Sequence, residues 1–145
     1  MTAFLQRVND IYYRLFGSTK LRPYEAICID LWKNHLSEES KNIFDEQLKQ
    51  PYIVQRQAGD AKVCFYWHKE ELLPLFKLST PDVHAATVLL KSKTNDSDVL
   101  KAKIFIHRGR FFSIEFPKRP NRYAELHHMD LSTLYVTAIE TLVPL

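Results

Sequence analysis

The stretch from Lys101 to Arg122 has the most distinctive chemistry in the sequence. Seven Lys and Arg side chains accompany one acid, Glu115, so this segment has a formal charge of +6 in a chain whose total is +3, and the remainder has −3. Cations interleaved with aromatic rings can bind an acidic protein surface, or they can hold a single-stranded nucleic acid. We therefore predict that a partner binds here. The predicted partner-binding residues are Lys101, Lys103, Phe105, His107, Arg108, Arg110, Phe111, Lys118, Arg119 and Arg122.

A plainer interpretation of the same residues does not involve a partner. If a helix or a connecting segment covers this part of the chain, Phe105 and Phe111 belong to the core and the lysines extend their charged ends to solvent. A pair between Lys101 and Glu115 on neighbouring strands is then ordinary sheet stabilisation. The exposure of the two phenylalanines decides between the two interpretations.

Histidines and carboxylates offer a weaker indication of an enzyme. His127 and His128 are adjacent, and neighbouring side chains point in different directions, so two such imidazoles seldom bind one ion together. If the chain is an enzyme, His107, Glu115 and His128 are the residues from which an acid–base site would be built. This dispersed site is the third of three functional hypotheses.

Motifs for nucleotide binding and nucleophilic catalysis are absent from the sequence. The chain has three isolated glycines, so it lacks a glycine-rich loop that could cradle a phosphate. Ser113 lacks the glycines that expose a catalytic serine on a strained turn. Cys28 is about two helical turns from His35, and the spacing of Cys64 and His68 is weak support for a metal site. We expect no catalytic residue, no metal and no cofactor.

Helical periodicity dominates the N-terminal third of the chain. Apolar residues recur on one face from Phe4 to Leu15, and Gly17 can end that helix. A second helix is predicted to open at Pro23, because proline suits a first helical position. Ser37 is predicted to cap a third helix that Pro51 ends.

Strand patterns follow from Tyr52 onward. We predict a hairpin of residues 52–57 and 62–67 around the turn 58–60, then an interior strand over 83–91 and a polar loop over 94–98. A second hairpin over 100–116 is predicted to turn through the three-residue loop His107-Arg108-Gly109, which places Phe105 opposite Phe111. A proline-bounded basic loop over 117–122 precedes a final helix over 131–142, with Asp130 as its cap.

These elements predict the fold class α+β. The expected order is N-terminal helices, an antiparallel β-meander of four to five strands and a C-terminal helix, all in a single domain of residues 1–145. Polar residues interrupt the first apolar stretch, no apolar run is long enough to span a membrane, and both cysteines are expected to be buried. We therefore expect a cytoplasmic protein that does not associate with membranes.

The leading functional hypothesis is a non-catalytic protein-binding domain that recognises its partner through complementary charge. Its general architecture, rather than any motif, resembles the immunity proteins with which bacteria inhibit protein toxins, and that resemblance implies a toxin as the partner. The alternative is a nucleic-acid-binding module that uses the hairpin and loop of residues 101–122. A separate acidic helix face formed by Glu38, Glu39, Asp45 and Glu46 is either solvated or a docking surface for a basic partner.

Overall fold

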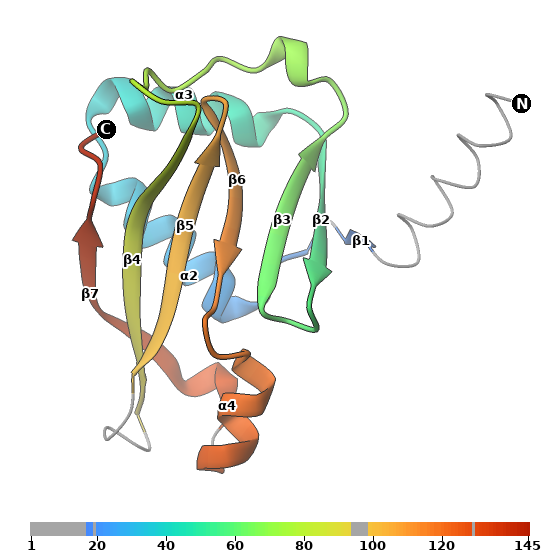
Figure 1. Cartoon of the computed structure of the whole chain (residues 1–145), viewed down its shortest axis with the longest axis vertical. Helices are drawn as coiled ribbons and strands as arrows, with labels where there is room; N and C mark the ends of the chain where they lie inside the picture. The colour runs from blue at the N-terminus through green and yellow to red at the C-terminus, as the bar shows by residue number, and fades with distance from the viewer. Residues whose placement is uncertain (1–16, 19, 94–98, 129) are drawn as a thin grey trace, which may run out of the picture.

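The computed structural model describes residues 17–18, 20–93, 99–128 and 130–145 (Figure 1). The predicted helix over residues 4–15 and the predicted polar loop over 94–98 lie outside the described residues. The helices are α2 (Pro23–Asn34), α3 (Glu38–Lys49) and α4 (Pro120–His127). The strands are β1 (Gly17–Ser18), β2 (Tyr52–Gln57), β3 (Lys62–Trp67), β4 (Asp82–Ser92), β5 (Leu100–His107), β6 (Arg110–Glu115) and β7 (Leu134–Thr141).

The strands form one antiparallel sheet in the order β1-β2-β3-β6-β5-β4-β7. Helices α2 and α3 pack on one face of this sheet, and α4 lies beyond the end of β6 that is remote from α3 (Figure 1). The predicted α+β class with an antiparallel meander is confirmed, but the sheet has seven strands where four to five were predicted. The predicted hairpin over 52–67 is also confirmed as β2 and β3, and the predicted interior strand lies within β4, between β5 and β7.

The two long helices, α2 and α3, begin at the residues where the sequence predicted their starts. Pro23 opens α2, and the Glu25 carboxylate accepts a hydrogen bond of 2.7 Å from the backbone N–H of Arg22. Glu25 is fully buried and also pairs with Arg56 on β2, which joins the start of α2 to the sheet. Ser37 caps α3, because its hydroxyl oxygen accepts from the Ser40 N–H at 3.2 Å.

Aromatic rings fill the space between the helices and the sheet. The Trp32 ring of α2 and the Phe44 ring of α3 have centroids 5.2 Å apart, and Phe44 contacts Phe111 of β6 at 5.1 Å. Phe111 in turn meets Phe65 of β3 edge-on at 4.9 Å. All four side chains are buried, so this cluster holds both helices against the middle of the sheet.

Gln47 of α3 reaches into the sheet where β3 and β6 separate. These two strands pair only between residues 62–64 and 113–115, and they spread apart toward α3 (Figure 1). The buried Gln47 side chain donates to the carbonyls of Pro74 (2.7 Å) and Gly109 (3.0 Å), and its oxygen accepts from the Phe111 N–H at 3.0 Å. Trp67 of β3 donates its indole N–H to the Gln47 carbonyl at 2.8 Å. The helix thus supplies hydrogen bonds that a neighbouring strand would otherwise make.

The second hairpin differs from the prediction in its turn. Arg108 and Gly109 form a two-residue turn with φ angles of 50° and 76°, and His107 pairs with Arg110. The register then shifts by one residue, because Phe105 pairs with Ser113 whereas Ile106 pairs with Phe111, so a β-bulge leaves Phe112 without a partner on β5. The predicted three-residue loop and the predicted placement of Phe111 opposite Phe105 are wrong. The prediction was based on a regular ladder without a bulge. The bulge shifts the pairing by one residue, so the apolar side chains of both strands can face the core although the turn has only two residues.

The C-terminal segment is a strand and not the predicted helix. After a short 3-10 helix (Leu131–Thr133), β7 pairs with β4, and its Val136 and Ile139 lie opposite Leu90 and Val88. The β-branched residues of this segment favour an extended backbone, and the edge of β4 provides hydrogen-bonding partners. The Asp130 side chain does act as a cap, since it accepts from the Ser132 N–H at 2.9 Å.

The last α-helix among the described residues instead occupies part of the segment that was predicted to be a basic loop. α4 begins at Pro120, within the predicted loop over 117–122. Its start is anchored by Asp60, whose buried carboxylate accepts from the Asn121 N–H at 2.7 Å. Proline at the first helical position and a carboxylate at the helix N-terminus both favour a helix here.

Removing the Gln47 amide should destabilise the whole chain. We expect Gln47→Met to lower the free energy of unfolding by roughly 2–3 kcal/mol, because it leaves the buried Phe111 N–H without an acceptor and removes the amide donor from the carbonyls of Pro74 and Gly109. The Gly109 carbonyl still accepts from the Phe76 N–H at 2.8 Å. Equilibrium unfolding in urea measures the change. The matched control is Gln50→Met, since the half-buried Gln50 side chain forms no hydrogen bond with any described residue, and it should lose less than about 0.5 kcal/mol. Equal losses for the two variants would contradict this role of Gln47.

Candidate binding face

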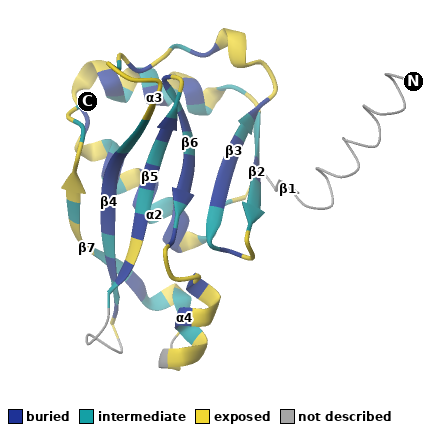
Figure 2. Cartoon of the chain, viewed as in Figure 1, coloured by how far each residue is buried: buried dark blue, intermediate teal, exposed yellow. Residues whose placement is uncertain are grey.

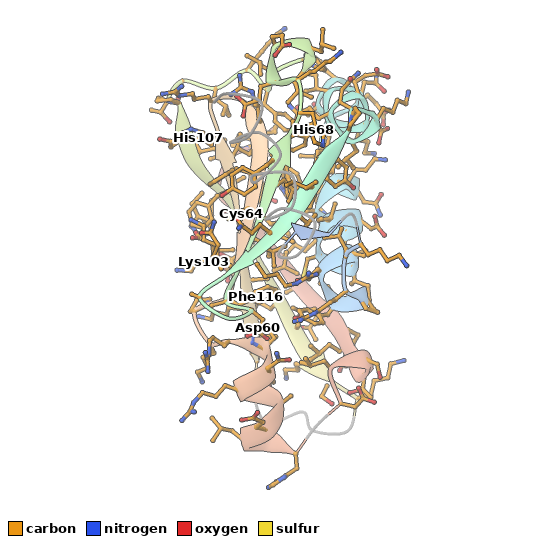
Figure 3. The ribbon with its side chains drawn as sticks, turned by 90° about the vertical axis from the view of Figure 1, so that its right-hand side faces the viewer. Asp60, Cys64, His68, Lys103, His107 and Phe116 are labelled. Atoms are coloured by element: carbon orange, nitrogen blue, oxygen red, sulfur yellow. The ribbon has the colours of Figure 1, made fainter. Side chains whose placement is uncertain are left out.

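The face of the sheet opposite α2 and α3, here called the open face, is covered by none of the described helices (Figure 1). Figure 3 shows Lys103 and His107 on this side of the sheet, away from the two helices. Exposure alternates along β5, so its odd-numbered residues lie on the open face and its even-numbered residues lie in the core (Figure 2). The side chains that form the middle of the open face are Lys62, Tyr66, Asp82, His84, Lys101, Lys103, Phe105, His107, Arg110, Phe112 and Glu115.

Half of the predicted binding residues gather on this face. These are Lys101, Lys103, Phe105, His107 and Arg110, and Arg108 is exposed on the turn beside them. Phe111 does not belong to the site, because the bulge turns its ring into the core, where its exposure is 0%. The interpretation in which both phenylalanines are buried therefore holds for Phe111 only, since Phe105 is half-buried on the open face.

The remaining three predicted residues form a separate cluster around α4. Lys118, Arg119 and Arg122 are exposed and line a hollow of about 340 Å³ together with Tyr123 and Leu126. Arg110 lies at one end of β6, and these three residues lie beyond its other end. At the rise of an antiparallel strand, the distance between the two sites is about 20 Å. The positive segment of the sequence therefore becomes two basic surfaces in space.

Three carboxylates lie next to basic side chains of the open face. The sequence analysis connected only Glu115 with this site, and it placed Glu115 opposite Lys101, whereas the structure pairs it with Lys103. Lys62 approaches Glu115 at 3.4 Å, and Arg110 approaches Glu70 at 3.5 Å. The Nδ1 atom of His107 contacts the carboxylate of Asp82 across the β4–β5 ladder. Asp82 reaches His107 from β4, and Glu70 reaches Arg110 from the 3-10 helix Glu70–Leu72, so the spacing of these residues along the chain did not indicate the contacts. These pairs give the open face a mixture of positive and negative charge.

The aromatic rings of the open face pack against neighbouring side chains. Phe105 stacks on His84, with centroids 4.9 Å apart and planes 22° apart. Phe112, which the sequence analysis also missed, lies 5.5 Å from the His107 ring, and the Lys62 ammonium lies 5.5 Å over its face. Burial lowers the pKa of His84, and nearby Lys103 lowers it further, so His84 is neutral at pH 7.

Two hollows meet at His107 and Phe112. The face hollow, of about 200 Å³, is lined by Lys62, Asp82, Phe105, Ile106, His107, Phe112, Ser113 and Glu115. The split cleft, of about 270 Å³, lies where β3 and β6 separate, and is lined by Phe65, Tyr66, Trp67, Glu70, His107, Arg110, Phe111 and Phe112. Both hollows combine apolar walls with a few charged groups, which is the usual composition of a recognition site.

The structure does not assemble the dispersed acid–base site as a unit. His107 and Glu115 both line the face hollow, but Glu115 pairs with Lys103, four residues along β5 from His107, which corresponds to about 13 Å. His128 is exposed at the end of α4 and lies in neither hollow. Among the described residues, no group of three His, Cys, Asp or Glu side chains is arranged to hold a metal ion.

The acidic face of α3 is close to neutral. Each of its four carboxylates forms an ion pair with a lysine, and the pairs are Glu38–Lys41, Glu39–Lys77, Asp45–Lys33 and Glu46–Lys49. Surface pairs of this kind contribute little stability, but they cancel the charge that a basic partner would recognise.

Comparison with known proteins finds no family model, curated protein or solved structure that matches this chain. In the part of the chain that the structure describes, no helix has both the length and the apolar character needed to cross a membrane. Inferences about function therefore depend on the geometry of the open face.

Both cysteines should be chemically inert in the folded protein. Burial raises the pKa of the Cys28 thiol to about 12 and also raises that of Cys64, and neither side chain is exposed. At pH 8 the thiolate of Cys28 is about a thousandfold less populated than that of a thiol at its ordinary pKa. We expect iodoacetamide to alkylate neither residue in native protein and both in urea, as measured by mass spectrometry. Rapid alkylation of the native protein would show that one thiol is accessible.

Proposed function

We propose that this chain is a non-catalytic protein-binding domain whose open face docks on an acidic surface of its partner. The single observation that supports this proposal is that most cations of the basic segment lack an acidic partner, whereas most of the carboxylates have a basic one. Six of the seven basic residues between 101 and 122 form no ion pair with any described residue, the exception being Arg110. Of these six, Lys101 and Lys103 lie on the open face and Arg108 lies on the turn beside it, whereas the other three lie around α4. Eight carboxylates, in contrast, already form an ion pair with a lysine or arginine, and Asp82 contacts His107. An acidic partner would complement these unpaired cations.

The mixed character of the open face favours a protein over a nucleic acid. Asp82 and Glu115 lie among the cations, where they would repel a phosphate backbone. A base-stacking platform needs free ring faces, yet His84 covers one face of Phe105 and Lys62 lies over Phe112. A protein surface can match both signs of charge, since its own acids and bases can be placed opposite those of the open face.

An inhibitor of the immunity type acts by this kind of docking alone. Covering an active site requires a rigid complementary surface and no chemistry of its own. The sheet provides rigidity, because β5 and β6 lie in its interior with strands on both sides. Unpaired Lys101 and Lys103 would accelerate association with an acidic partner through long-range attraction.

Two charge-matched variants test the proposal. The face variant, Lys101→Ser with Lys103→Ser, and the α4 variant, Lys118→Ser with Arg119→Ser, each remove two unpaired cations from different ends of the basic segment. The partner is first captured at low salt from cells of the source organism with the tagged protein, and its association rate is then measured by surface plasmon resonance. We expect the face variant to associate about tenfold more slowly, and the α4 variant to change less than about twofold.

The other outcomes of this experiment would contradict the proposal. Equal slowing by both variants would mean that net charge, and not the open face, governs binding. Capture of nuclease-sensitive nucleic acid with no protein partner, and with affinity that falls steeply with salt, would support the nucleic-acid module instead.

A further inference from the structure

The split cleft differs from the rest of the open face because it passes between two strands into the core. Tyr66, Phe112 and Arg110 line its outer part, and the core residues Phe65 and Phe111 form its inner wall. It exists because Gln47, and not β3, bonds the Phe111 N–H of β6. The cleft is therefore a consequence of the fold and not a gap left by a mobile side chain.

Arg110 is the positive group of this cleft, and its guanidinium is only partly satisfied. The side chain is 22% exposed, and its Nη1 atom lies 3.5 Å from Glu70 Oε2. Its Nε atom is buried, and no described residue accepts a hydrogen bond from it. A buried donor without an acceptor is unfavourable, and the side of the guanidinium formed by Nε and Nη matches the two oxygens of a carboxylate.

Glu70 is a poor permanent partner for this guanidinium. It lies on a three-residue 3-10 helix, its side chain is 57% exposed, and its Oε2 atom is 3.5 Å from Arg110 Nη1, which is longer than an ordinary charge-assisted hydrogen bond. An exposed ion pair of this geometry contributes little, so a second carboxylate can compete with it. Glu70 therefore occupies part of the position that a better acceptor would take.

We propose that the split cleft binds the side-chain carboxylate of an aspartate or glutamate from the partner protein. Because Nε is buried in the free protein, binding has to uncover this atom; Arg110 then donates from Nε and one Nη to the two carboxylate oxygens, and the rings of Tyr66 and Phe112 contact the methylene stem. Glu70 moves away into solvent. This inference relies on the proposed function for the source of the carboxylate, and it names one anchor point on the acidic partner.

A carboxylate suits this cleft better than a phosphate. A single guanidinium matches a ligand of one negative charge, and Glu70 at the rim would repel a doubly charged group. The aromatic walls favour an acid on an apolar stem, as in an amino-acid side chain.

The test uses a probe that does not require the partner. N-acetyl-glutamate N-methylamide presents one side-chain carboxylate, and the corresponding glutamine compound is its uncharged control. We expect the glutamate probe to move the Nε–H signal of Arg110 in NMR spectra of the ¹⁵N-labelled protein, in a saturable manner. The Nε–H signal of exposed, unpaired Arg122 serves as the control for non-specific binding and should change only linearly and weakly.

Two substitutions should change the affinity for this probe in opposite directions. Arg110→Gln should weaken binding by about 10- to 100-fold, as expected for loss of a charge-assisted pair. Glu70→Gln should strengthen it by about 2- to 5-fold, because it removes the competing carboxylate without removing the guanidinium. Circular dichroism establishes that each variant is folded. Because Glu70 is exposed, its substitution still tests the inference if Arg110→Gln does not fold.

The results separate this inference from the proposed function. Equal shifts with the glutamine compound, or a Glu70→Gln variant that binds the glutamate probe more weakly, would overturn the carboxylate site. A site that behaves as expected, combined with a face variant that associates at the normal rate, would leave the cleft in place and refute the proposed function. Partner binding that depends on Lys101 and Lys103 but is unaffected by Arg110→Gln would refute the cleft alone.

Discussion

Gln47 is fully buried, and its side-chain amide bonds three backbone groups: one at Pro74, and two in the β5–β6 hairpin, at Gly109 and Phe111. Without an acceptor at this point, the Phe111 N–H would need β3 as its neighbour, and the sheet would close. Because α3 supplies the acceptor, β3 can separate from β6 after only three paired residues on each strand. One amide therefore anchors the hairpin turn to the helix layer and keeps the split cleft open.

The β-bulge at Phe112 completes the arrangement on the other face. Because of the bulge, the side chains of Ile106 and Phe111 both lie in the core although the turn at Arg108 and Gly109 has only two residues. It also frees Phe112 from pairing, so its ring lies between His107 and Lys62 and borders both hollows. Bulges often reorient a side chain at a functional surface, and here the reoriented residue joins the two hollows.

Local signals predicted much of the fold. Pro23 and Ser37 identified the starts of two helices, and the turn at Gly59 identified the first hairpin, because each signal acts within a few residues. The apolar spacing over 131–142 was compatible with a helix. The segment forms a strand because the edge of β4 offers it backbone hydrogen bonds, and the sequence of the segment alone does not show that edge. The bulge at Phe112 was likewise not predicted, and the residue before it, Phe111, bonds Gln47, which lies more than sixty residues earlier in the chain.

The candidate site shows the same division between local and long-range information. Alternation along β5 placed Lys101, Lys103, Phe105 and His107 on one face correctly, because a strand's parity is local. Glu115 faces Lys103 within the same hairpin, but Asp82 and Glu70 come from other segments, and no spacing in the sequence reveals those contacts. The positive segment of the sequence does not form one positive surface, because β6 separates its two halves. On the open face, the neighbouring carboxylates determine how much positive charge is available to a partner. The pairing of charges across the ladder, more than their number along the chain, therefore determines what this face can recognise.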